Sequence, residues 1–150
     1  MWIFVISILM IGLTVGIHTL GAVFWLGHLG HRIDHYSRQN KQLPLLRGIL
    51  TTAIALITLH VVEAFLWAIL YLQLPSQAGL KNMQEAVYFS MITFTTIGYG
   101  DITLNKQWQL LAGVEGMVGI VVFGLTAATL FAVIQKSWKL GKHKSGGHDK

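Results

Sequence analysis

Three long apolar stretches constrain this chain more than any other feature. The first lies within residues 1–27, and the others cover residues 47–72 and 108–135. Of the 150 residues, 53% are hydrophobic and 11% are charged, which is too apolar for an ordinary soluble domain. A helix of about 20 apolar residues crosses a bilayer with all its backbone polar groups satisfied. The sequence therefore predicts an all-α membrane protein with three transmembrane helices.

The first apolar stretch has an alternative interpretation as a cleaved signal peptide. No Lys or Arg precedes it, however, and it exceeds the core of about 7–15 apolar residues that such signals carry. We therefore expect residues 1–27 to remain as an additional N-terminal transmembrane helix.

Cationic side chains lie mainly in two polar segments. Residues 28–46 carry several Lys and Arg side chains against the single acid Asp34, and a basic tail covers residues 136–150. Basic connections are cytoplasmic by the positive-inside rule, so three spans place the N-terminus outside. We expect the tail to be disordered. The net charge of +5 thus reflects membrane topology, and the predicted partner is the lipid bilayer rather than nucleic acid.

Aromatic side chains near the ends of the predicted spans support these boundaries. Trp and Tyr are enriched where a membrane meets water. Trp67 and Tyr71 follow this pattern near the outer end of the second span, and we expect both to be interfacial anchors. All five tryptophans fall near predicted span ends, at Trp2, Trp25, Trp67, Trp108 and Trp138.

A short helix and an irregular segment separate the last two spans. Residues 82–94 read as a helix that is too short to cross the membrane, with Asn82 as its N-cap and Glu85 completing a capping box. Residues 95–101 follow with the sequence TTIGYGD. Gly98 and Gly100 can adopt positive φ, so successive carbonyls can turn to one side and form a ladder of oxygen ligands. The alternative is an ordinary turn.

The TTIGYGD string resembles the selectivity filter of potassium channels. The resemblance covers residues 47–135 and implies an outer helix (47–72), a re-entrant pore helix (82–94), the filter (95–101) and an inner helix (108–135). It also implies a four-fold symmetric homotetramer, because one chain supplies only one side of the cage around an ion. The implied K⁺ ligands are the carbonyls of Thr96, Ile97, Gly98 and Tyr99, together with the Thr96 hydroxyl.

The resemblance also implies supports for this filter. Asp101 resembles the family's bracing carboxylate, which pore-helix tryptophans hold in many relatives. This chain has Tyr88 and Phe89 at the corresponding positions, and only the tyrosine can donate a hydrogen bond. Ile92 stands where some relatives carry a second carboxylate. We expect the filter to be supported by Thr95, Gly100, Asp101 and Tyr88.

The predicted inner helix carries several glycines. By resemblance, Gly119 is the expected gating hinge and Gly124 the less favoured one, with close helix packing as the alternative role. Glu115 is expected to be a buried partner of the pore helix. Thr126 and Thr129 either face the cavity or bond back to their own helix.

Two groups of histidines are candidates for further sites. His60 and Glu63 share one face of the second span, where they form either a pH-sensitive pair or a hydrogen-bonded pair that joins helices. His28, His31 and His35 have helical spacing that would suit zinc, but this spacing is a weak signal, and an ordinary solvated membrane-proximal segment is the favoured interpretation.

The sequence thus favours a potassium-selective channel over other classes. It has no nucleotide cradle or catalytic motif, so we expect neither an enzyme nor a cofactor, with K⁺ as the permeant ion. The absence of cysteine excludes disulfides and thiolate metal sites. The alternative is a nonconducting regulatory or assembly subunit that retains the pore fold. The compact construction suggests a bacterial cytoplasmic membrane.

Overall fold

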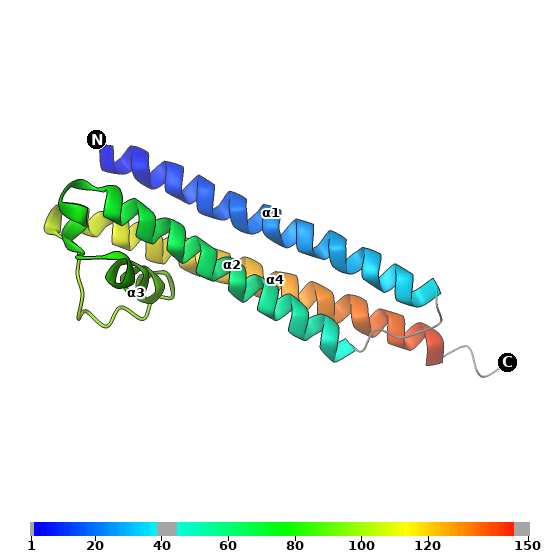
Figure 1. The fold of residues 1–150 in the computed structure, drawn as a ribbon. Helices are drawn as coiled ribbons and strands as arrows, with labels where there is room; N and C mark the ends of the chain where they lie inside the picture. Colours follow the sequence, from blue (N-terminus) through cyan, green and yellow to red (C-terminus); the bar gives the residue numbers. More distant parts are fainter. Residues whose placement is uncertain (1, 39–44, 146–150) are drawn as a thin grey trace.

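Three long helices lie side by side in the computed structural model of this chain (Figure 1). The structure describes the backbone of residues 2–38 and 45–145, and the side chains of residues 2–31 and 46–136. Within these parts the chain forms helices and no strands. The long helices are α1 (Trp2–Arg38), α2 (Leu45–Gln73) and α4 (Gln109–Ser145), and each contains a segment long and apolar enough to cross a membrane.

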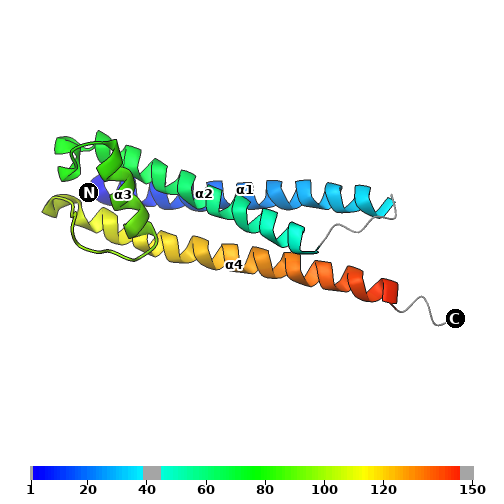
Figure 2. The ribbon, with the colours of Figure 1, turned by 60° about the horizontal axis from the view of Figure 1, so that its bottom comes forward.

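The long helices alternate in direction, and α1 packs against both α2 and α4 (Figures 1 and 2). The N-terminal end of α1 lies at the same end of the bundle as the short helix α3 (Met83–Phe94), and the C-terminal end of α4 lies at the opposite end. The additional N-terminal helix therefore rests on the two long helices of its own chain.

Two helix ends differ from the sequence-based expectation. The prediction that the first helix ends at residue 27 is wrong, because α1 continues through Gly27 and Gly30 to Arg38. A glycine in a helix costs about 1 kcal/mol relative to alanine, which does not stop a helix whose neighbours favour it. The expected disorder of the tail is also incorrect for its first part, since α4 continues to Ser145. Residues 39–44 and 146–150 lie outside the described residues.

The start of α3 follows the predicted capping box. The Asn82 side chain accepts a hydrogen bond from the Glu85 backbone N–H at 2.9 Å. The Glu85 carboxylate in turn accepts one from the Lys81 backbone N–H at 2.6 Å. These bonds satisfy backbone donors that the first turn of a helix leaves free. The prediction that the helix begins after Asn82 and ends at Phe94 is confirmed.

Two short 3₁₀ helices flank the segment that carries α3. The first, η1 (Pro75–Gly79), contains a left-handed turn over residues 76–78, and the second, η2 (Lys106–Trp108), directly precedes α4. The Asn105 backbone N–H donates to the Ala78 carbonyl at 2.9 Å. This bond joins the loop before α3 to the loop after residues 95–101, so both ends of the intervening segment are held together.

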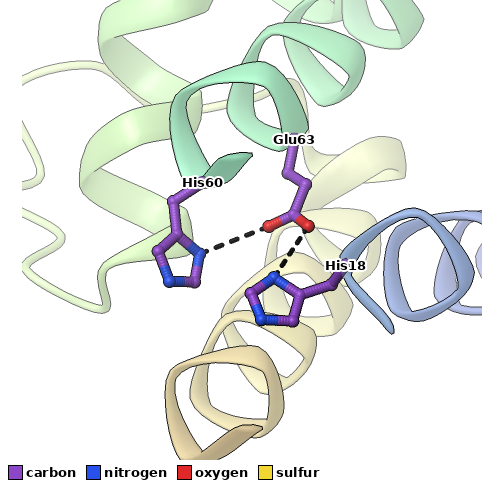
Figure 3. Close-up of side chains that lie close together, drawn as sticks. All are labelled: His18, His60 and Glu63. Atoms are coloured by element: carbon purple, nitrogen blue, oxygen red, sulfur yellow. Dashed lines mark hydrogen bonds and ion pairs between the residues drawn. The ribbon is translucent and has the colours of Figure 1, made fainter. Parts of the chain in front are cut away.

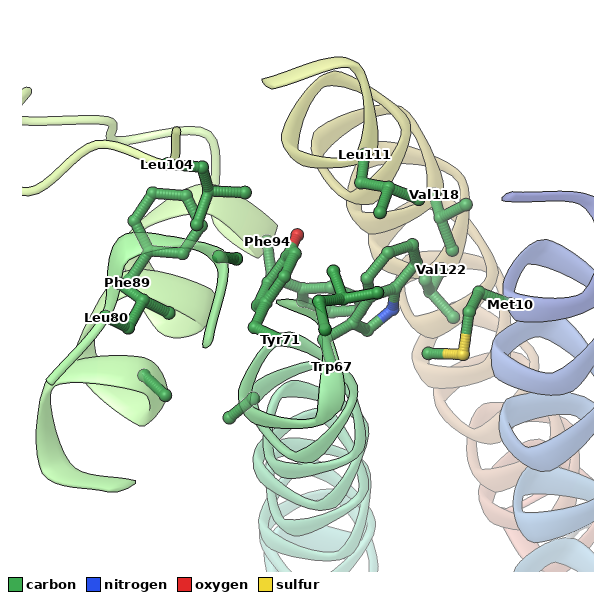
Figure 4. Packing of buried hydrophobic residues seen from close by; sticks show 14 residues of the cluster. Met10, Trp67, Tyr71, Leu80, Phe89, Phe94, Leu104, Leu111, Val118 and Val122 are labelled. Atoms are coloured by element: carbon green, nitrogen blue, oxygen red, sulfur yellow. The ribbon is translucent and has the colours of Figure 1, made fainter. Parts of the chain in front are cut away.

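Trp67 and Tyr71 lie in the core rather than at a membrane interface (Figure 4). Both side chains are fully buried, and the Trp67 indole N–H donates to the Thr14 hydroxyl of α1 at 3.1 Å. Their assignment as interfacial anchors is therefore wrong. A neighbouring helix supplies the polar partner that water would otherwise supply, so the rings can pack between helices where contact area stabilises the bundle.

Candidate functional site

The segment after α3 has an alternating backbone. Thr96, Gly98 and Gly100 all have positive φ, at 61°, 53° and 79°. In an extended chain successive carbonyls point to opposite sides, whereas a left-handed residue at every second position turns them toward a common side. Glycine adopts this conformation readily, while Thr96 does so at a cost of about 1–2 kcal/mol. The conformational freedom predicted for the two glycines is confirmed, and Thr96 adds an unpredicted third position.

Hydrogen bonds fix the start of this segment to the last turn of α3. The Thr95 hydroxyl donates to the Met91 carbonyl at 2.7 Å, and the Thr96 N–H donates to the Thr93 carbonyl at 2.9 Å. The Gly98 N–H donates to the Ile92 carbonyl at 3.0 Å. The backbone thus turns away from the helix end in a defined direction.

The predicted ligand carbonyls lie at the surface of the single chain. Ile97 and Tyr99 are 55% and 71% exposed, and none of the hydrogen bonds among the described residues is accepted by the carbonyls of residues 96–99. Four consecutive hard oxygen acceptors therefore remain available. Oxygen ligands of this kind suit alkali and alkaline-earth cations.

Asp101 and Tyr88 lie in contact across the end of this segment. The Tyr88 hydroxyl donates to Asp101 Oδ2 at 2.8 Å. This hydrogen bond raises the pKa of Tyr88 above its ordinary value, since the carboxylate accepts from the neutral phenol only. Phe89 is instead buried, with its ring edge-on to Tyr71 at 5.4 Å, and Ile92 is also buried. Of the two aromatic residues at these positions, only Tyr88 contacts Asp101 through a polar group.

A buried carboxyl group joins α4 to α3 and α2. Glu115 of α4 accepts a hydrogen bond from the Tyr71 hydroxyl at 2.6 Å and contacts the Ser90 hydroxyl through its other oxygen. The Ser90 hydroxyl also donates to the Ala64 carbonyl at 2.7 Å. The Ser90 hydroxyl has one proton, which it donates to Ala64, so it can only accept from Glu115. The contact between Ser90 and Glu115 is therefore a hydrogen bond only if Glu115 is protonated and donates to Ser90.

The sequence indicated Glu115 as a partner of α3 but missed both of its side-chain partners. Ser90 and Tyr71 lie among apolar neighbours in the sequence, and Tyr71 also fits an interfacial role. No spacing in the sequence links either residue to a glutamate on a different helix.

Gly119 marks the closest approach of α4 to the end of α3. A Cβ atom at this position would lie 1.9 Å from the Phe94 carbonyl oxygen, whereas a Cβ at Gly124 would meet no atom within 4 Å. The close contact supplies a packing reason for the glycine. Its role as a hinge stays a prediction.

His60 and Glu63 form part of a larger buried cluster (Figure 3). His60 Nδ1 lies 3.3 Å from Glu63 Oε2, and His18 Nδ1 of α1 lies 3.0 Å from Glu63 Oε1. Sequence reasoning missed His18, although an ionisable residue within the first apolar stretch was a signal that it has a partner. Thr126 of α4 also contacts His60, at 2.9 Å between Oγ1 and Nε2.

The remaining candidates do not gather into a site among the described side chains. His28 and His31 are exposed on α1, and the side chain of His35 lies outside the described residues. The Thr129 hydroxyl bonds back to the Leu125 carbonyl at 2.8 Å, one of its two predicted arrangements.

Comparison with known proteins identifies the class. Residues 49–136, more than half of the chain, match the family model described as ion channel. The chain therefore belongs to this ion channel family. No match was found among curated proteins or among solved structures. Family membership and the three apolar helices define an integral, multi-pass membrane protein.

Proposed function

We propose that this protein is a potassium-selective channel that conducts K⁺ passively through a central pore. The observation that carries the proposal is the alternating backbone of residues 96–100, which directly follows α3 in a chain of the ion channel family. Such a backbone presents a row of carbonyl oxygens that can replace the water around a cation. The GYG sequence at residues 98–100 favours K⁺ over Na⁺, by its resemblance to potassium-channel filters.

The geometry of α3 supports this role. The helix is 12 residues long and ends at Phe94, next to the first predicted ligand. A helix carries partial negative charge at its C-terminal end, which favours a cation nearby. We therefore assign α3 as a re-entrant pore helix, α2 as the outer helix and α4 as the inner helix.

The functional unit we propose is a homotetramer. A single chain leaves the carbonyls of residues 96–99 on an open surface, and one row of oxygens cannot surround an ion. Four chains about a central axis would complete the cage. In this arrangement Thr96 to Tyr99 coordinate K⁺, while Thr95, Gly100, Asp101 and Tyr88 hold the filter in place.

The expected orientation places residues 95–101 toward the outside and the C-terminal end of α4 in the cytoplasm. The N-terminal end of α1 and the helix α3 lie at the same end of the bundle, which agrees with an external N-terminus. The proposed location is a bacterial cytoplasmic membrane.

Flux measurements on purified protein in liposomes test the proposal. We expect K⁺ to pass, Na⁺ to be excluded and Ba²⁺ to block. Gly98→Ala should abolish flux, because alanine strains a backbone with φ of 53°. Gly12→Ala is the matched control, since a Cβ at Gly12 meets no atom within 4 Å.

The oligomeric state of each sample distinguishes the alternatives. An intact wild-type tetramer without flux would contradict the channel and favour a nonconducting regulatory or assembly subunit. Equal passage of Na⁺ and K⁺ would contradict the selectivity alone.

A further inference from the structure

Four side chains from three helices form a closed ring of polar contacts inside the bundle. Figure 3 shows three of them, His18, His60 and Glu63. Glu63 contacts the Nδ1 atoms of His18 and His60, at 3.0 Å and 3.3 Å. The Nε2 atoms of the same two imidazoles both face the Thr126 hydroxyl, at 3.3 Å for His18 and 2.9 Å for His60. The ring therefore joins α1, α2 and α4.

Three members of this ring are buried, whereas Thr126 is half-buried. His18 and Glu63 are fully buried, and His60 is 7% exposed. Ionisable groups within membrane-spanning helices are costly unless they are paired and hydrogen-bonded. The favoured protonation state of the ring is therefore one that gives each contact a donor and an acceptor and also keeps the net charge of the ring close to zero.

The hydrogen bonds can be counted. When Glu63 is ionised, its carboxylate only accepts, so both Nδ1 atoms then carry a proton and donate to Glu63. Two bare Nε2 atoms would then compete for the single proton of the Thr126 hydroxyl. One additional proton resolves this conflict, because one imidazolium donates to Thr126 while the Thr126 hydroxyl donates to the other imidazole.

The charges give the same count. With one additional proton, the ring contains one imidazolium and one carboxylate and is neutral. With no additional proton, both imidazoles are neutral and the charge of the Glu63 carboxylate is uncompensated. With two additional protons, the ring has a net positive charge, and the Thr126 hydroxyl loses its acceptor within the ring. A buried site in an apolar bundle favours the neutral, fully bonded state.

We propose that His18, His60, Glu63 and Thr126 form a buried site that binds a single proton, shared between the two imidazoles. The helix α1 contributes His18 to the ring, α2 contributes His60 and Glu63, and α4 contributes Thr126. The other buried carboxyl among the described residues, Glu115, is bonded to Tyr71 and Ser90.

The geometry favours a proton over a metal ion. Two imidazoles and a carboxylate are a common ligand set for zinc, and their ligand atoms here lie within 4.8 Å of one another. However, the rings are stacked, with centroids 5.1 Å apart and an angle of 26° between their planes. Their Nδ1 atoms face different oxygens of Glu63 instead of converging on one point. A divalent ion would also leave the buried site with a net positive charge.

The proton site lies beside the proposed pore elements. The His60 ring stacks on Phe123 of α4 at 4.3 Å and lies 5.9 Å from Phe94, the last residue of α3. Loss of the proton leaves one Nε2 without a donor and weakens the contact between Thr126 and the other two helices. We expect proton occupancy to change K⁺ flux, an effect that rests on the proposed channel function.

Nitrogen-15 NMR of the purified, histidine-labelled tetramer tests the site without requiring conduction. Spectra of His18→Gln and His60→Gln assign the signals. We expect both Nδ1 atoms to be protonated, with one further proton shared between the two Nε2 atoms. Thr126→Val should weaken binding of that proton about tenfold, because it removes the hydroxyl that pairs both nitrogens. Thr126→Ser should preserve it, and His28→Gln should leave these signals unchanged.

Two NMR results would overturn the proton site. One is a pair of neutral imidazoles with bare Nε2 atoms throughout the histidine titration range. The other is loss of both Nδ1 protons on addition of Zn²⁺, which would establish a metal site instead.

Potassium flux at a series of pH values tests the coupling. Wild type and Thr126→Ser should share one pH profile, and His18→Gln and Thr126→Val should change it. A pH-independent wild-type flux would overturn the coupling. If flux is absent altogether while the NMR titration is as expected, the channel proposal fails and the proton site stands.

Discussion

Glu63 and Glu115 are both fully buried carboxyl groups, yet their surroundings favour opposite charge states. Glu63 faces the Nδ1 atoms of two imidazoles, which suit an ionised carboxylate when both carry a proton. Glu115 faces the Tyr71 hydroxyl and a serine whose only proton is directed to a carbonyl, which suits a protonated acid. The comparison shows that the number of protons its neighbours can donate, rather than burial alone, determines the state of each acid.

The largest expected effect separates the two acids by the same substitution. Glu63→Gln should lower the free energy of unfolding by about 3–5 kcal/mol, since it removes one partner of a buried ion pair. Glu115→Gln should cost less than about 1 kcal/mol, because an amide can donate to Ser90 and accept from Tyr71. Unfolding of the two purified variants in mixed SDS micelles measures both changes in the free energy of unfolding. Equal losses of stability in Glu63→Gln and Glu115→Gln would contradict the assigned charge states.

A second substitution tests whether Glu115 is needed at all. Glu115→Ala should destabilise the protein by about 2–3 kcal/mol in the same assay, because the buried hydroxyls of Tyr71 and Ser90 lose a partner. Glu115→Gln serves as the control that keeps the size and the hydrogen bonds. If alanine is tolerated as well as glutamine, the contacts of Glu115 contribute nothing measurable.

Near Glu115, the α4 helix approaches the backbone of α3 closely at Gly119. Gly119→Ala should cost about 1–3 kcal/mol, because its Cβ would overlap the Phe94 carbonyl and force α3 and α4 apart. Gly12→Ala on α1 should be nearly neutral, since no atom lies within 4 Å of its Cβ position. A Gly119→Ala protein that unfolds with wild-type stability would contradict the close contact.

The smallest effect concerns an exposed acid, Asp101, which extends the comparison to the surface. The hydrogen bond that Asp101 accepts from Tyr88 raises the pKa of that tyrosine. The stability that this bond contributes is therefore fully present below the ordinary tyrosine pKa of about 10, and it is lost as pH rises through the raised pKa. A pH titration of tyrosinate absorbance in wild type and in Asp101→Asn measures the shift in the pKa of Tyr88. Each protein is compared with its own Tyr88→Phe variant, so that the signal of Tyr88 can be isolated. An unchanged Tyr88 titration in Asp101→Asn would rule out the contact.

The sequence predicted the long helices and α3 well because these elements depend on local signals. Apolar length defined the spans, and Asn82 with Glu85 defined the start of α3. The ends of α1 and α4 were less predictable, because Gly27, Gly30 and the basic tail disfavour a helix only weakly.

The two buried clusters were only partly predictable because they depend on contacts between helices. His60 and Glu63 share a helix face and could be paired from spacing alone, whereas His18 is 45 residues away from Glu63. Tyr71 similarly matched an interfacial pattern that its bond to Glu115 overrides. Which helix faces which is decided by three-dimensional packing, and a single sequence does not record it.

The placement of α1 on its own chain has a consequence for cooperativity. His18, His60, Glu63 and Thr126 all belong to one chain, so a homotetramer would carry four proton sites with none shared across a subunit boundary. If flux changed with pH more steeply than four independent proton sites allow, the excess would then arise from concerted movement of the four inner helices. A Hill coefficient near one would indicate that each subunit responds alone.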